Sequence, residues 1–164
     1  MLIQIPPTPT GNQFLPNPPQ PHCSPKITSR GSYIIYSDGG SYSTQKKPHP
    51  PSYGSFLIYK NGQVLIHKQL VYDDETNNSA EHRTLFEALS WLVENGNLTK
   101  LDRIVVIMDS KLVVNQVLGN WKCKKSNTQY WTHKTQTLIR TQIPKCYFNI
   151  EWHPRKVLVE KLGH

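Results

Sequence analysis

The sequence predicts an α/β fold in which a mixed sheet carries helices on its faces. Two observations indicate it. Strand-like segments come first in the chain, and a tight hairpin signal joins two of them, which is typical of antiparallel pairing. From about residue 77 onward, helix-like and strand-like segments alternate, which is typical of parallel strands connected by helices.

The first three segments are predicted strands. Residues 33–38 form a β-branched and aromatic run that ends at Gly39-Gly40, as a buried strand stopped by a turn would. Residues 53–60 and 63–72 follow after a loop rich in proline and lysine. Asn61-Gly62 joins these two runs, and both central positions of a type I′ turn adopt positive φ, so this dipeptide predicts a tight hairpin.

Helical spacing begins after Asn77-Asn78-Ser79, whose short polar side chains are typical N-caps. Apolar residues then recur at helical intervals from Ala80, and the helix should end at Asn95-Gly96. The remaining expected elements are a strand over 103–109, a helix from Ser110 to Leu118 stopped by Gly119, a helix over 128–141, a strand over 146–152, and a loop with a short helix over 153–164.

The N-terminal segment differs in composition from the rest of the chain. Eight of the 13 prolines and no acidic residue lie in residues 1–30. Proline cannot donate the hydrogen bonds of a sheet, so we expect a disordered or polyproline-like tail at residues 1–31 and one domain at 32–164. Composition favours a plain linker, and a PxxP-type ligand for a protein partner is the alternative.

The chain is basic, with a net charge of +8. Leaving out Lys26 and Arg30 of the tail leaves 17 basic and 11 acidic residues, or +6. A basic domain of this size indicates a polyanionic partner, of which nucleic acid is the commonest, while charge for solubility alone is the ordinary alternative.

Three cysteines without a CxxC pair indicate neither a disulfide framework nor a structural zinc site. Cys146 lies in an apolar run, which is typical of a core residue. No run approaches the roughly 18 apolar residues needed to span a membrane. We therefore expect no membrane contact and a reducing, intracellular location, in the cytoplasm or in an organelle.

Four acidic residues lie where one edge of a sheet could gather them. Asp38 ends the first strand and Asp109 ends the fourth, so both carboxylates would share one edge if these strands are parallel neighbours. Glu81 lies in the first turn of a helix, and Glu160 lies on the last helix. Clustered carboxylates repel each other and favour hard divalent cations such as Mg²⁺ or Mn²⁺. Two such ions about 4 Å apart could activate a water and stabilise the leaving oxygen of a phosphodiester.

Each acidic residue also has an ordinary structural explanation. Asp38 before two glycines is typical of a turn, and Asp109 before a serine is typical of a strand end followed by a helix cap. Glu81 suits the positive end of a helix dipole, and Glu160 suits a solvated surface. Taken singly, each residue favours the ordinary explanation, so only the combination points to a site.

The combination resembles type 1 ribonuclease H over about residues 33–164. Four segments carry the likeness, and the second and third in this order are the most specific: Tyr36–Ser41, Thr76–Glu81, Val106–Ser110, and Trp152–Arg155 followed by Glu160-Lys161-Leu162. The resemblance implies a ribonuclease H-like five-stranded mixed sheet, its first three strands antiparallel, flanked by helices. It also implies an endonuclease that hydrolyses the RNA strand of an RNA–DNA hybrid with two Mg²⁺ ions, for which Mn²⁺ can substitute. We expect a monomer.

The resemblance further implies roles for matching positions. Asp38, Glu81 and Asp109 would be catalytic metal ligands, with Asp38 shared by both ions. Glu160 would supply the fourth carboxylate, which is normally an aspartate in the family. His153 would assist proton transfer or product release, with His164 as the other candidate. Substrate contacts are expected from the following positions: Gly39, Gly40, Ser41, Asn77, Asn78, Ser110, Lys122 and Arg155, with Lys46, Lys47, Lys124 and Lys125 as further phosphate contacts.

Three other classes of function stay open. A ribonuclease H-like module could bind nucleic acid without cutting it, and the short last helix together with Glu160 motivates this alternative. Another nuclease of the same fold, such as a transposase or a Holliday-junction resolvase, would cut DNA and not RNA. An interaction protein would act through the proline-rich tail and not through the domain.

Overall fold

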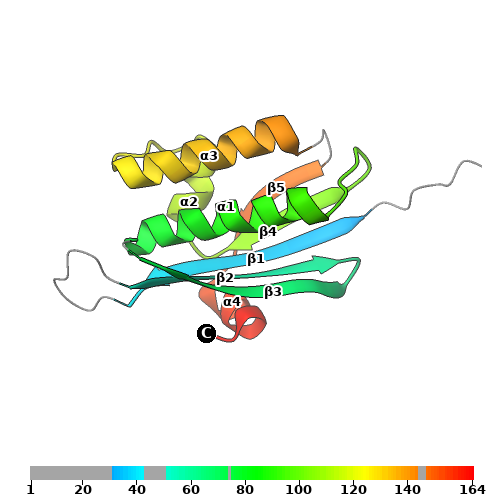
Figure 1. Cartoon of the computed structure of the whole chain (residues 1–164), viewed down its shortest axis with the longest axis horizontal. Helices are drawn as coiled ribbons and strands as arrows, with labels where there is room; N and C mark the ends of the chain where they lie inside the picture. Colours follow the sequence, from blue (N-terminus) through cyan, green and yellow to red (C-terminus); the bar gives the residue numbers. More distant parts are fainter. Residues whose placement is uncertain (1–30, 43–50, 74, 144–146) are drawn as a thin grey trace, which may run out of the picture.

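A five-stranded mixed sheet in the order β3-β2-β1-β4-β5 forms the centre of the molecule (Figure 1). The computed structural model describes residues 31–42, 51–73, 75–143 and 147–164. Its strands are β1 (Ser32–Ser41), β2 (Ser52–Lys60), β3 (Gln63–Tyr72), β4 (Arg103–Met108) and β5 (Tyr147–Trp152). β2 pairs with β1 and β3 in antiparallel fashion, whereas β4 runs parallel to both β1 and β5. The predicted mixed sheet, with its first three strands antiparallel, is confirmed.

Helices cover both faces of this sheet (Figure 1). The helices are α1 (Asn77–Asn95), α2 (Lys111–Val117), α3 (Ser126–Gln142) and α4 (Arg155–Leu162). The first three lie on one face, and α4 packs on the opposite face against β1, β2 and β4. None of the helices in the described part of the chain is long and apolar enough to cross a membrane. Residues 1–30 of the expected tail, the lysines 46 and 47, and Cys146 lie outside the described residues.

Alternation along the strands separates two apolar cores. Tyr33 and Ile35 of β1 pack with residues of α1, including Leu85, in the larger core. Tyr36 of the same strand packs with Leu158 of α4 in the smaller one. Since successive side chains of a strand point to opposite faces, a single strand serves both cores, and Asp38 lies on the face of α4.

The turn and cap predictions had mixed outcomes. Asn61 and Gly62 adopt φ values of +51° and +79°, which confirms the predicted hairpin between β2 and β3. Ser110 caps α2, accepting a hydrogen bond from the Val113 amide. The predicted caps of α1 at 77–79 were wrong, because Thr76 is the extended residue whose hydroxyl accepts the Ser79 amide.

Candidate active site

Three carboxylates meet where β1 and β4 end. Asp38 lies near the end of β1, Asp109 directly follows β4, and Glu81 lies at the start of the second turn of α1. Parallel pairing of β1 with β4 aligns the two strand ends, as the sequence suggested. One carboxylate oxygen from each residue lies within 4.8 Å of the other two. The structure therefore brings together three of the four predicted metal ligands.

Gly39 allows the start of α1 to lie directly on β1. A Cβ atom at residue 39 would stand 2.6 Å from the carbonyl oxygen of Ala80 and 2.7 Å from the amide nitrogen of Glu81. The missing side chain is what allows Glu81 to approach Asp38. Gly39 and Gly40 are both buried. Both glycines therefore have a packing role, and their predicted contact with substrate stays a prediction.

The charge of the cluster has no full internal compensation. The Asp38 side chain is 1 % exposed, and its oxygens lack a well-formed hydrogen bond from any described residue. Burial raises the pKa of Asp38, the Arg155 guanidinium opposes that rise, and Asp109 adds to it. Burial raises the pKa of Glu81 to about 7, opposed by a hydrogen bond from Ser110 and reinforced by Asp38 and Asp109. Buried carboxylates with unpaired oxygens fit a hard divalent cation.

Arg155 is the cation that the chain itself places on this cluster. Its Nη1 donates to Oδ2 of Asp109 at 2.9 Å and lies 3.5 Å from Oδ2 of Asp38. The side chain is 54 % exposed, so it can also turn toward solvent. Arg155 is the first residue of α4, which lies within the predicted loop and short helix, and its partners are Asp109 and Asp38. Its predicted contact with a phosphate stays a prediction.

Glu160 does not join the cluster, so the prediction that it supplies a fourth ligand is not met. Arg155, Leu158 and Leu162 share the face of α4 that is turned toward the sheet. Glu160 follows Arg155 by five residues, which places it about 140° around the helix axis. Glu160 is exposed there. Among the described residues, the carboxylates that form the cluster are Asp38, Glu81 and Asp109.

The histidine at the site is His164 rather than His153. His153 lies 3.1 Å from Glu151 through its Nε2, and its amide donates to the carbonyl of Met108. His164 places Nε2 3.6 Å from Oδ2 of Asp38. Gly163 explains the difference, because its φ of +85° ends α4 in a left-handed cap and turns the last residue back toward β1.

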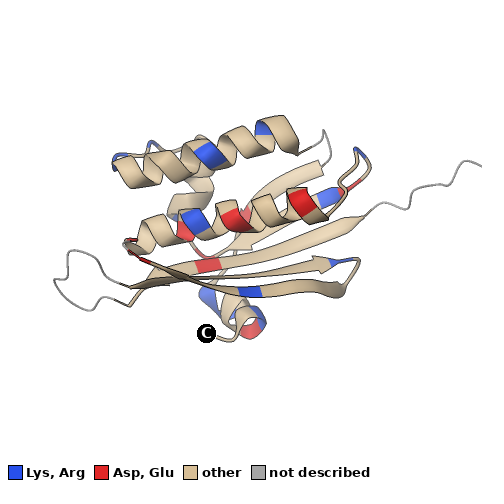
Figure 2. Cartoon of the chain, viewed as in Figure 1, with Lys and Arg blue, Asp and Glu red and all other residues tan. Residues whose placement is uncertain are grey.

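Other predicted contacts lie at the start of α1 and in the loop that precedes α3. The side-chain oxygen of Asn77 accepts the Ser41 amide at 3.1 Å and so ties the start of α1 to the end of β1. Asn78 and Lys122 line one cavity of about 310 Å³, together with Lys124 and Lys125. The basic residues of the loop that precedes α3 are visible in Figure 2. Asn78, Lys122, Lys124 and Lys125 thus form one basic surface at the start of α1.

The carboxylate site also has aromatic neighbours that sequence reasoning missed. Burial and, after it, the nearby Asp38 carboxylate raise the pKa of Tyr53 in β2, and a hydrogen bond with Arg155 opposes that rise. Tyr42 packs beside Tyr53, with ring centroids 5.0 Å apart. Alternation along β2 could have placed Tyr53 on the Asp38 face, but only the register of β1 with β2 sets it opposite Gly40.

Known proteins match this sequence and this fold. A model of the RNase H family matches residues 30–153. The bifunctional protein Rv2228c of Mycobacterium tuberculosis is 34% identical over 123 residues, which are 74% of this chain and 31% of that protein. The chain thus spans about a third of the length of this curated relative.

Solved structures of RNase H proteins also match the fold of this chain. The N-terminal RNase H domain of Rv2228c from Mycobacterium tuberculosis, a fusion with maltose binding protein, has a TM-score of 0.65 and 29% identity, covering 79% of this chain and 86% of that one. LC11-RNase H1, isolated from compost by a metagenomic approach, has a TM-score of 0.69 and 26% identity, covering 79% and 89%. LC11-RNase H1 in complex with an RNA/DNA hybrid aligns with a TM-score of 0.65 and 24% identity, covering 78% and 89%. This chain belongs to the RNase H family, in its type 1 branch, as the motifs predicted.

Proposed function

We propose that this protein is a metal-dependent endonuclease that hydrolyses the RNA strand of RNA–DNA hybrids. The observation that carries the proposal is the group of three carboxylates, Asp38, Glu81 and Asp109, within 4.8 Å of one another. Family membership supports the reaction class, and the LC11-RNase H1 complex supports a hybrid as substrate. The basic surface at the start of α1 supports a polyanionic ligand.

Asp38, Glu81 and Asp109 would hold the metal, and Asp38 would be shared because neither of its oxygens accepts a well-formed hydrogen bond from a described residue. Two Mg²⁺ or Mn²⁺ ions bound there would supply the charge that activates a water and stabilises the leaving 3′-oxygen. Ser110 orients Glu81 by a hydrogen bond from its hydroxyl. Arg155 neutralises part of the carboxylate charge, and its exposure allows it to turn to a phosphate of the substrate.

Other residues of the chain would position the hybrid. Asn78, Lys122, Lys124 and Lys125 line one cavity near the start of α1, where phosphate oxygens can accept their hydrogen bonds. Contacts with phosphates carry no information about the kind of strand, so selection for RNA would depend on its 2′-hydroxyl groups. Asn77 and Asn78 are the proposed minor-groove residues, and Asn77 is held by its bond with Ser41.

The decisive experiment is cleavage of a hybrid labelled on either strand, with millimolar Mg²⁺ or Mn²⁺. We expect cutting of the RNA strand alone, with 5′-phosphate and 3′-hydroxyl products, and no cutting in EDTA. Asp109→Asn should abolish the reaction, whereas Glu160→Gln is the matched control and should retain it, because Glu160 lies outside the cluster. Full activity of Asp109→Asn would overturn the proposed site.

A second candidate function is binding of the hybrid without cutting. The observation that favours it is the face of α4, where Arg155 and His164 contact Asp38 and no carboxylate of this helix joins the cluster. The same assay separates the two functions. A hybrid that is retained by the wild-type protein but stays intact with either metal would establish the binding module.

A further inference from the structure

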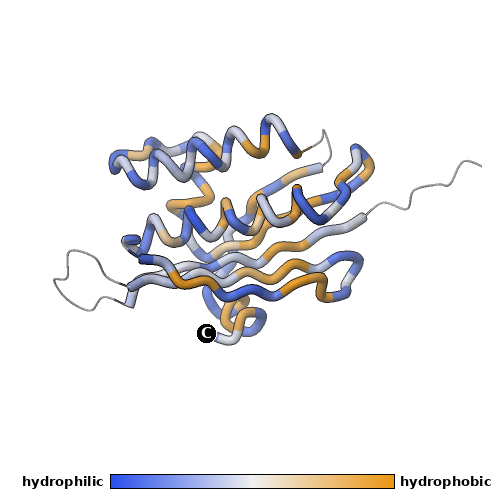
Figure 3. Tube along the Cα trace, in the orientation of Figure 1, coloured by the Kyte–Doolittle hydropathy of each residue, from blue (hydrophilic) through white to orange (hydrophobic). Residues whose placement is uncertain are grey.

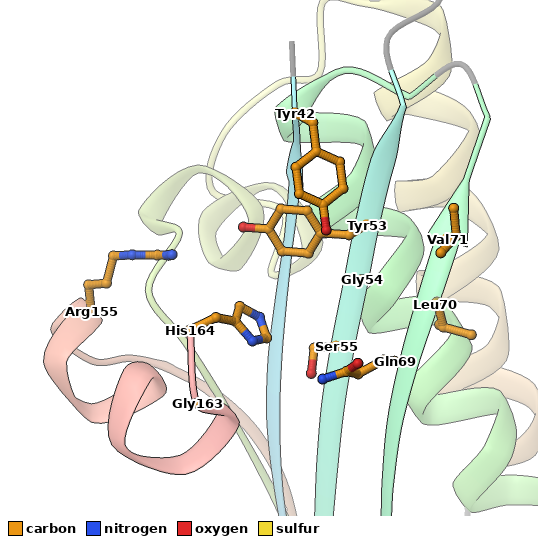
Figure 4. A pocket seen from close by; sticks show the side chains of 10 residues that line it. All are labelled: Tyr42, Tyr53, Gly54, Ser55, Gln69, Leu70, Val71, Arg155, Gly163 and His164. Atoms are coloured by element: carbon orange, nitrogen blue, oxygen red, sulfur yellow. The ribbon is translucent and has the colours of Figure 1, made fainter. Parts of the chain in front are cut away.

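A pocket opens beside the carboxylate cluster, on the face of the sheet that carries α4 (Figure 4). Its volume is about 400 Å³. The lining side chains that matter here are two tyrosines, two cationic or ionisable groups and two uncharged polar groups: Tyr42, Tyr53, Arg155, His164, Ser55 and Gln69. Arg155 and His164 also contact Asp38, at 3.5 Å and 3.6 Å, so the pocket and the cluster share a wall.

The position of the Tyr53 ring is set by the strand beside it. Residue 53 pairs with Gly40 of β1, and a Cβ atom at Gly40 would stand 2.7 Å from the Tyr53 hydroxyl. The ring therefore lies across β1 with its hydroxyl directed toward Arg155, as Figure 4 shows. Gly40 thus has a role that neither the metal ligands nor the core require, which is to hold an aromatic ring next to the cluster.

The second ring completes an aromatic wall. Tyr42 is 64 % exposed and lies at an interplanar angle of 42° to Tyr53. His164 meets Tyr53 edge-on, with centroids 5.5 Å apart. Two tilted tyrosines and an edge-on imidazole leave aromatic surface open to a ligand. Gln69, which pairs with the buried Ser55 across β2 and β3, supplies an amide at the same wall, and Tyr42 adds an exposed hydroxyl.

These groups match the three parts of one nucleotide. Aromatic faces stack on a base, an amide and a hydroxyl can bond with its edge, and a guanidinium binds a phosphate. The volume of about 400 Å³ lies near the lower end of the range for ligand pockets, which suits one nucleotide rather than a base pair. A paired base within a duplex is already stacked on its neighbours, so only an unpaired base can use such a wall.

We propose that this pocket holds one unpaired nucleotide of the strand that is cut, next to the paired segment that crosses the carboxylates. The inference rests on the proposed function, because the cut strand must cross Asp38 and the pocket adjoins Asp38 through Arg155 and His164. The base stacks on Tyr42 and Tyr53, and Arg155 binds the adjoining phosphate. The preferred substrate is therefore a hybrid whose RNA strand continues past the last base pair.

The test measures binding of four hybrids with Glu81→Gln, which keeps the pocket while lacking a carboxylate of the cluster. One hybrid is blunt, two carry a single unpaired ribonucleotide at the 3′ or the 5′ end of the RNA, and the fourth carries an abasic residue at the preferred end. We expect one overhang to bind about 5- to 100-fold more tightly than the blunt hybrid. The abasic residue should lose this gain.

Variants of the pocket test whether the tighter binding of the overhang depends on its aromatic wall. Adding Tyr53→Ala should abolish the gain, while Tyr53→Phe, which keeps the ring, should keep most of it. Tyr147→Ala is the matched control, because Tyr147 is an exposed tyrosine at the opposite end of the parallel strands, and it should leave the gain unchanged. Equal binding of all four hybrids, or equal binding of the abasic and complete overhangs, would overturn the pocket. Cutting of a blunt hybrid by the wild-type protein tests the proposed function separately.

Discussion

The guanidinium of Arg155 lies 2.9 Å from Oδ2 of Asp109, at the point where three buried or nearly buried carboxylates meet. This contact joins the first residue of α4 to the end of β4 across 46 positions of the chain. It gives the cluster a cation of its own. Arg155 must therefore compete with any divalent ion for the oxygens of Asp38 and Asp109.

Removal of this competitor should strengthen metal binding. For Arg155→Ala at pH 8 we expect Mn²⁺ to bind about 3- to 10-fold more tightly, since a surface ion pair of this kind is worth roughly 1 kcal/mol. Isothermal titration calorimetry gives both the affinity and the number of ions, and two ions are expected under the proposed function. Lys161→Ala is the control, because Lys161 lies on α4 away from the cluster. Weaker binding by Arg155→Ala would show that the arginine supports the metal site.

Glu81 should destabilise the metal-free protein at neutral pH. Its pKa in the folded protein is about 7, against an ordinary value of 4.5, so the folded state holds this proton more tightly. The associated stability is present at low pH and is lost as the pH rises from about 4.5 through 7. Glu81→Gln in EDTA should therefore raise the free energy of unfolding at pH 8 by about 1 to 3 kcal/mol.

Urea denaturation at pH 5 and pH 8 measures this effect. The gain from Glu81→Gln should be smaller at pH 5, where the wild-type carboxyl is protonated. Mg²⁺ should stabilise the wild-type protein more than the variant. A variant that is less stable than the wild type at both pH values would contradict the assignment of Glu81 as a strained carboxylate.

His82 should lower the stability of the protein at acidic pH, whereas protonation of Glu81 raises it. It is fully buried, its Nε2 lies 2.8 Å from Oε1 of Gln116, and burial lowers its pKa below the ordinary 6.5. Below pH 6.5 the unfolded state binds this proton more readily, so stability falls as the pH decreases. The Glu81→Gln background removes the gain in stability that protonation of Glu81 gives at low pH. In this background the melting temperature should fall between pH 7 and pH 5. Adding His82→Gln should flatten this slope, and an unchanged slope would assign it to another group.

Gly39→Ala should damage both the fold and the metal site. The new Cβ would lie 2.6 Å from the Ala80 carbonyl oxygen, and backbone atoms on both sides cannot yield by rotation. We expect a loss of about 1 to 3 kcal/mol in unfolding free energy and weaker Mn²⁺ binding, because α1 and Glu81 would move away from Asp38. Ser32→Ala, at an exposed position of the same strand, is the control and should change neither quantity. Normal Mn²⁺ affinity in Gly39→Ala would contradict the proposed link.

Much of the local structure could be predicted because local rules govern it. The Asn61-Gly62 hairpin follows from the backbone preferences of two residues, and the cap of α2 follows from the hydroxyl of Ser110. The meeting of Asp38 and Asp109 could also be anticipated, since parallel neighbours end at one edge. The start of α1 lies one to three residues before the predicted caps at 77–79, because Thr76 also carries a side chain able to cap a helix.

The errors lie where a side chain's role depends on the packing of a whole element. Glu160 and His153 lie in the segment that resembles the family's last motif. The sequence does not show which face of α4 packs on the sheet, or that the turn at Gly163 brings His164 to Asp38. Likewise Tyr53 is an ordinary strand residue until the pairing of β1 with β2 sets it opposite Gly40.

The sequence by itself determined the order of the elements, the family, and the three carboxylates, because periodicity and short motifs depend on neighbours along the chain. Only the tertiary structure decided that Arg155 and His164 contact Asp38, and that a pocket with an aromatic wall adjoins it. The physical reason is that these contacts join residues far apart in sequence, whose distances depend on strand register and on the rotation of α4 about its axis.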